Sequence, residues 1–207
     1  MPKIIWAGCR KWDEDYPEEP MPEHAVKINS PEHPFRAGMK YALPPVLLCF
    51  AVLFIKKWIC GAFPLDRRFV FAGIVAGLIL VPVHELLHAV CFPENSTVYI
   101  GLSPEKFAAF AVCHFPLSKR RFVVMSLLPA VLGIVPLLLF CVFPVSWGIA
   151  SAVCWPAAMI GLVSPYPDYM DAVQFRKQVP DGAWIQSGND GWHWYRKSSE
   201  SQEESIF

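Results

Sequence analysis

The sequence predicts an all-α polytopic membrane protein with about four transmembrane helices and two small β-hairpins. Hydrophobic residues make up 54% of the 207-residue chain and charged residues only 17%, which is more apolar than an average soluble domain. Four apolar runs of roughly 20 residues follow one another, and a run of that length can cross a hydrocarbon core of about 30 Å. Two shorter segments of strand-forming residues flank turn sequences and predict the hairpins.

The composition also excludes several classes of function. Lys and Arg total 18, as do Asp and Glu, so no basic excess is available to neutralise nucleic-acid phosphates. The seven cysteines form no Cys-x-x-Cys pair and fall mostly inside apolar runs. We therefore expect no nucleic-acid partner, no disulfide framework and no thiolate zinc site.

The transmembrane part is expected to follow a polar, proline-rich tail at residues 1–40, which lacks the apolar core of a signal peptide. Pro44 and Pro45 suit the start of the first membrane helix, and Lys56 and Lys57 near its end are interpreted as snorkelling residues. The transmembrane domain is predicted to cover residues 41–177, with spans at about 42–60, 69–92, 122–143 and 145–163.

Two hairpins are predicted outside the membrane. The first is expected at residues 97–114, around the turn sequence Ser103-Pro104-Glu105. The second lies within residues 178–197, where aromatic strands flank a turn rich in glycine and asparagine. The last residues, 198–207, are expected to be disordered.

Basic residues near the helix ends predict the orientation of the chain. Four crossings place both termini and the loop at 93–121 on one side of the membrane. That side carries Arg36, Lys40, Lys119, Arg120, Arg121, Arg176 and Lys177, whereas the opposite side carries Lys56, Lys57, Arg67 and Arg68. The positive-inside rule therefore predicts an integral membrane protein with cytoplasmic N- and C-termini.

A cluster of ionisable residues lies inside the second predicted span, at His84-Glu85-Leu86-Leu87-His88. Residues four apart share one face of a helix, so both imidazoles can bind a single zinc ion while Glu85 stands beside the zinc-bound water. An inert, hydrogen-bonded cluster between helices is the alternative. Because an ionisable side chain at membrane depth is costly without a partner, we favour a metal, which would supply one.

A third zinc ligand is needed, because catalytic zinc normally has three protein ligands and a water molecule. The fourth predicted span leads into Pro167 and Asp168, on the same side of the membrane as His88. Asp168 is the first choice because it lies nearest the membrane exit. Asp171, on the same helical face, is the second choice or a hydrogen-bond partner of a ligating histidine. Alternatively, both aspartates serve only as favourable charges at a helix N-terminus.

These features resemble the putative zincin peptidase family of small bacterial membrane proteins, which is similar to the site-2-protease class of intramembrane zinc metallopeptidases. The likeness covers roughly residues 69–196. It rests on His84-Glu85-Leu86-Leu87-His88-Ala89, on Leu-Ser-Lys-Arg-Arg-Phe at 117–122 before Leu128-Pro129, on Asp168 and Asp171, and on Val-Pro-Asp-Gly-Ala at 179–183.

The resemblance implies a bacterial plasma membrane protein with a site-2-protease-like fold. It also implies a Zn²⁺ cofactor held by two histidines and an aspartate from a later helix. Site-2 proteases carry Asn-Pro-Asp-Gly around that aspartate, whereas this chain keeps only Pro167-Asp168.

The expected function is hydrolysis of a peptide bond, with Glu85 as general base for a zinc-activated water. The partners would be the lipid bilayer and a membrane-protein or peptide substrate. His114 could assist the oxyanion of the transition state, although a lone loop histidine is more often structural. One alternative is a non-catalytic zinc-binding membrane protein with a regulatory or assembly role. The other is a zinc hydrolase that cleaves a lipid or another amide. The sequence predicts no oligomeric state.

Overall fold

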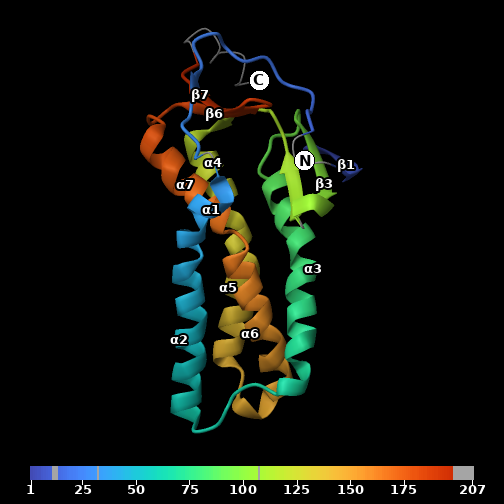
Figure 1. Ribbon diagram of the computed structural model, residues 1–207, viewed down its shortest axis with the longest axis vertical. Coiled ribbons are helices and arrows are strands. Elements are labelled where there is room, and N and C mark those ends of the chain that lie inside the picture. Colours follow the sequence, from blue (N-terminus) through green and yellow to red (C-terminus); the bar gives the residue numbers. More distant parts are fainter. Residues whose placement is uncertain (11–13, 32, 107, 198–207) are drawn as a thin grey trace. The chain divides into compact units, whose positions relative to one another are not determined.

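The computed structural model describes residues 1–10, 14–31, 33–106 and 108–197. The α-helices in the described part of the chain, labelled in Figure 1, are α1 (Pro34–Gly38), α2 (Leu43–Cys60), α3 (Val70–Ala89), α4 (Lys119–Leu127), α5 (Val131–Val142), α6 (Gly148–Val163) and α7 (Tyr166–Gln178). The strands are β1 (Lys3–Cys9), β2 (Val26–Lys27), β3 (Thr97–Ser103), β4 (Ala108–Val112), β5 (Leu117–Ser118), β6 (Trp184–Gly188) and β7 (Gly191–Tyr195). The tail predicted to be disordered, 198–207, lies outside the described residues.

Among the described residues, four helical stretches are long and apolar enough to cross a membrane. They are Arg36–Cys60, Arg67–Ala89, Lys119–Val142 and Val145–Gln178. The mostly helical class and the number of spans are thus confirmed by length and composition. Small sheets accompany the helices, as described below.

Several helix boundaries differ from the prediction, and the first and fourth stretches extend to Arg36 and Gln178. The second span was predicted to continue to residue 92, but α3 ends at Ala89, because the residue before Pro93 is driven away from helical backbone angles. The third span begins at Lys119, earlier than expected, and a 3₁₀ turn at Leu128–Ala130 separates α4 from α5. Pro129 lies in that turn and cannot donate a helical hydrogen bond.

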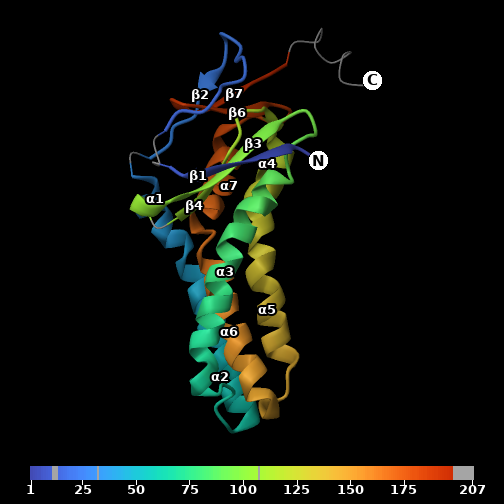
Figure 2. The ribbon, with the colours of Figure 1, turned by 90° about the vertical axis from the view of Figure 1, so that its right-hand side faces the viewer.

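The chain divides into two compact units, each of which is described by itself. The bundle unit comprises residues 33–87 and 127–170, and the sheet unit comprises residues 1–32, 88–126 and 171–207. In the bundle unit, the long helices α2, α3, α5 and α6 run alongside one another (Figures 1 and 2).

Glycines let the helices of the bundle unit approach closely. Gly73 and Gly77, four residues apart on α3, face α6: a Cβ added at Gly73 would lie 2.6 Å from the carbonyl oxygen of Ala152, and one at Gly77 would lie 2.6 Å from Ile160. At the contact of α5 with α6, a Cβ on Gly161 would lie 2.7 Å from the backbone nitrogen of Gly133. Small residues at such spacing are typical of closely packed membrane helices.

The prediction that Lys56 snorkels to the membrane surface is wrong. Its side chain is buried, and its Nζ donates hydrogen bonds to the carbonyl oxygens of Phe140 and Phe143 at the end of α5, the second at 2.8 Å. The ammonium group also lies 4.3 Å from the centre of the Phe140 ring. A cation at a helix C-terminus pairs with carbonyls that have no intrahelical donor and with the negative end of the helix dipole.

The sheet unit contains two small sheets. In the first, β3 lies between β1, which runs parallel to it, and β4, which runs antiparallel (Figure 2). The second has the order β2-β7-β6-β5, with every neighbouring pair antiparallel. Each predicted hairpin segment therefore belongs to a larger sheet. β1 and β2 were not predicted, because each forms by pairing with a strand far away in the sequence.

Aromatic side chains form the centre of the sheet unit. The ring of Phe122 on α4 stacks on that of Phe175 on α7, with 4.6 Å between the ring centres. Trp192 on β7 packs edge-on against both rings, at 5.1 and 5.5 Å. These contacts hold the start of α4 and the later part of α7 against the second sheet by burial of apolar surface.

Replacing Lys56 tests its role in the bundle unit. We expect Lys56→Met to lower the thermal unfolding midpoint in detergent, because a buried carbonyl that loses its donor costs about 1–3 kcal/mol. The control is Lys57→Met, since Lys57 is the exposed neighbour on the same helix. Circular dichroism would measure both midpoints, and equal midpoints would contradict the capping role.

Candidate metal centre

The last two turns of α3 carry the ionisable cluster. His84 is 8% exposed as a residue, and the side chain of Glu85 is 13% exposed. His88 lies one turn further along α3 and is half-buried. The 3.6-residue repeat of the helix places both imidazoles on one face, while Glu85 follows His84 directly.

Asp168 lies in the first turn of α7, immediately after α6. The phenol of Tyr169 donates a 2.9 Å hydrogen bond to the carbonyl oxygen of Leu162, and its backbone N–H donates to the carbonyl of Pro165. Gly38 leaves room for the Tyr166 ring, since an added Cβ would approach that ring to 3.0 Å. The end of α6 thereby fixes the start of α7 and the place where Asp168 emerges.

The structure brings His84, His88 and Asp168 together. One possible ligand atom from each lies within 4.8 Å of the other two. The Nε2 of His84 is 3.1 Å from Oδ2 of Asp168. Zinc bonds of about 2.0–2.2 Å in a tetrahedron place two ligand atoms about 3.3 Å apart, so this spacing suits a shared ion. Two imidazoles and one carboxylate also form a donor set that leaves a fourth position for water.

His88 is oriented by the backbone of α4. Its Nδ1 lies 3.1 Å from the carbonyl oxygen of Met125. A carbonyl oxygen only accepts hydrogen bonds, so Nδ1 carries the proton and Nε2 keeps its lone pair. That lone pair is what a metal ion requires, and such a hydrogen bond behind a ligating histidine sets its ring orientation.

Glu85 lies beside His84 and is not one of the three potential ligands. Its Oε1 is 4.0 Å from Nε2 of His84, and its side chain is mostly buried. A carboxylate at that place can accept a proton from a water molecule held between the ligands.

The other predicted site residues lie outside this group. Asp171 follows Asp168 on α7 and is not among the three residues whose ligand atoms converge. His114 is buried in the sheet unit, where its Nδ1 lies 2.9 Å from the carbonyl oxygen and 3.1 Å from the Oγ of Ser187. A role for His114 in oxyanion stabilisation stays a prediction.

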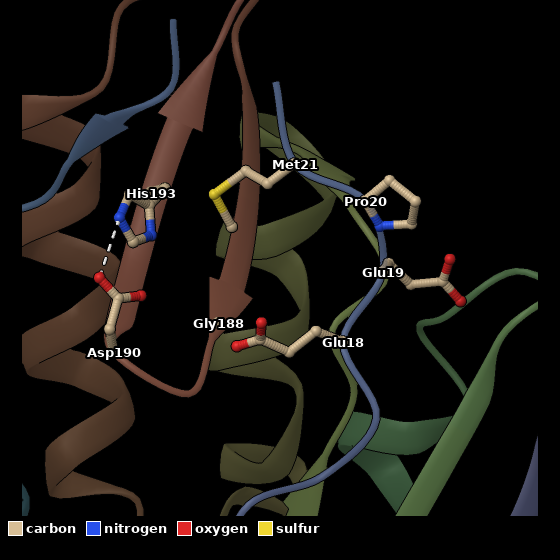
Figure 3. Close-up of a pocket in the computed structure, with 7 residues that line it drawn as sticks. All are labelled: Glu18, Glu19, Pro20, Met21, Gly188, Asp190 and His193. Carbon is tan, nitrogen blue, oxygen red and sulfur yellow. Dashed lines mark ion pairs between the residues drawn. The ribbon is translucent and has the colours of Figure 1, made fainter. Parts of the chain in front are cut away.

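A pocket of the sheet unit is drawn in Figure 3. It is lined by Glu18, Glu19, Pro20, Met21, Gly188, Asp190 and His193. The Nε2 of His193 lies 3.5 Å from Asp190, and a hydrogen bond from Lys27 lowers the pKa of the Asp190 carboxyl. Within the described ranges, only the His84, His88 and Asp168 group collects three potential metal ligands within 4.8 Å, so this pocket is not a metal site of that kind.

The cysteines do not compete for the metal centre. Each of the seven is a free thiol. In the sheet unit, burial raises the pKa of Cys113 to about 11, which keeps it protonated at neutral pH. A thiol held in its protonated form is a poor zinc ligand.

A comparison with protein-family models finds a match to a family described as "Putative zincin peptidase", over residues 77–184, which is more than half of the chain. The chain belongs to this family. The matched segment of this zincin peptidase family member includes His84, Glu85, His88 and Asp168. Comparisons with curated proteins and with solved structures find no significant match.

Met125 is the residue of the zincin centre that the sequence analysis missed. It contributes only its backbone carbonyl, which every residue possesses, so the identity of its side chain carries no signal. The role of Met125 can be recognised only from the three-dimensional structure, in which α4 lies next to His88.

Metal content tests the ligand set. We expect Asp168→Ala to lower the zinc occupancy of the purified protein much more than Asp171→Ala, because Asp168 belongs with both histidines to the group whose ligand atoms lie within 4.8 Å of one another. Inductively coupled plasma mass spectrometry would measure zinc per chain. A larger loss in Asp171→Ala would assign the third ligand to Asp171 instead.

Proposed function

We propose that this member of the zincin peptidase family is a zinc-dependent, membrane-embedded peptidase. The observation that carries the proposal is the convergence of His84, His88 and Asp168 within 4.8 Å, with Glu85 directly beside them. Family membership supports a metallopeptidase. Four apolar helices support placement in the bilayer.

Each residue of the site would have a distinct chemical role. His84, His88 and Asp168 would hold the metal ion. When bound, zinc activates a water molecule and polarises the peptide carbonyl. Glu85 accepts the proton of the attacking water and returns it to the nitrogen of the leaving amine.

The arrangement is similar to that of site-2 proteases, in which two histidines of one helix and an aspartate of a later helix hold zinc. We extend the proposal to a site-2-protease-like fold in a bacterial plasma membrane, with both termini in the cytoplasm. The excess of basic residues flanking the helices on the side of the termini supports this orientation. The substrate would be a membrane protein or a peptide delivered at the bilayer.

Glu85→Gln separates metal binding from catalysis. We expect the variant to keep the zinc occupancy of the wild type but to cleave peptides at least about 100-fold more slowly, since removing a general base typically costs 10²–10⁴ in rate. The assay would incubate detergent-purified protein with a peptide library and identify new termini by mass spectrometry. Glu105→Gln, an exposed carboxylate in the sheet unit, is the matched control.

The outcomes distinguish the proposed peptidase from a non-catalytic zinc protein. Removal of zinc with 1,10-phenanthroline should abolish cleavage, and added zinc should restore it. A wild-type protein that holds zinc but cleaves no faster than Glu85→Gln would support the regulatory or assembly role. Loss of zinc in Glu85→Gln would make Glu85 a ligand rather than a base.

A further inference from the structure

The hydrogen bond behind His88 depends on a carbonyl whose α-helical donor is missing. In an α-helix, the carbonyl of residue i accepts from the N–H of residue i+4. For Met125, that donor would belong to residue 129, which is proline and has no N–H. The same carbonyl oxygen lies 3.1 Å from Nδ1 of His88.

The local backbone agrees with a missing bond at this place. The α-helical pattern of α4 stops at Leu127, a 3₁₀ turn covers Leu128–Ala130, and α5 resumes at Val131. After the turn, the backbone N–H of Val131 reaches back to the carbonyls of Leu128 and Pro129. The interruption therefore lies where the proline removes the donor for Met125.

We propose that Pro129 is a positioning residue for the metal centre, because it frees the Met125 carbonyl to accept the Nδ1–H of His88. This inference rests on the proposed function, in which Nε2 of His88 binds zinc. An N–H at position 129 would hold that carbonyl along the helix axis and share its lone pairs, which weakens its hydrogen bond with His88. The imidazole would then lose the partner that selects its tautomer and its orientation.

The chain offers a matched control in the same membrane segment. Pro136 lies inside α5 and deprives the carbonyl of Leu132 of its helical donor in the same way. Pro136→Ala therefore restores a helical N–H in a membrane helix without touching the carbonyl that His88 uses. It reports the general effect of replacing a helix proline by alanine.

A second pair of variants isolates the N–H from the loss of the proline ring. Pro129 is fully buried, so Pro129→Ala also removes packing atoms. Lactic acid incorporated at position 129 has the same methyl side chain as alanine, but an ester oxygen replaces the N–H. These two variants leave the same space unfilled and differ in the donor.

The experiment measures the zinc dissociation constant of the full chain in detergent by competition with a chelator of known affinity. We expect Pro129→Ala to bind zinc 10–100-fold more weakly than wild type, as is typical when the hydrogen bond behind a ligating histidine is lost. The lactic acid variant and Pro136→Ala should stay within about threefold of wild type. Equal dissociation constants for Pro129→Ala and the lactic acid variant would overturn the inference.

A spectroscopic readout on the zinc-free protein does not depend on the proposed function. The ¹⁵N chemical shifts of histidine rings report which nitrogen carries the proton. We expect His88 to be the Nδ1–H tautomer in the wild type and the lactic acid variant, and a mixture of tautomers in Pro129→Ala. A wild-type protein that binds no zinc would refute the metal centre, whereas an unchanged tautomer in Pro129→Ala would refute the role of Pro129.

Discussion

The structure depends on the cost of leaving a polar group without a partner in apolar surroundings. Water is scarce among packed membrane helices, so an unpaired carbonyl or charge there is expensive. Lys56 meets the carbonyls at the end of α5, and His88 meets the carbonyl of Met125. His84 meets Asp168. Lys56, His88 and His84 thus lie where a helix end, a break in a helix or another ionisable group provides a complementary partner.

Close contact between helices fixes the relative positions of these paired groups. In the bundle unit, Gly73 and Gly77 bring α3 against α6, and Gly161 brings α6 against α5. Because α6 continues into the first turn of α7, the contact of α3 with α6 also determines how His84 meets Asp168. A rigid frame of this kind holds ligands at a set spacing better than surface loops do.

Features that depend on local sequence could be predicted, and those that depend on distant partners could not. The apolar runs and the spacing of His84 and His88 follow from hydropathy and helical periodicity alone, and the membrane exit of the fourth span pointed to Asp168. The environment of Lys56 was predicted wrongly. The sequence shows its charge and its position near a helix end, but it does not show that the end of α5 lies beside it. The strand β1 was missed because it forms only against β3.

The pairing of β2 with β7 has a consequence for biosynthesis. The sheet unit is assembled from three separate stretches of the chain, and its second sheet joins residues near the N-terminus to the last described strand. All four apolar helical stretches are therefore synthesised before β2 can pair with β7. Until β7 is synthesised, β2 lacks the strand with which it pairs. Completion of this sheet is therefore a late folding event that requires β6 and β7, and a polypeptide that stops before them is left with exposed strand edges.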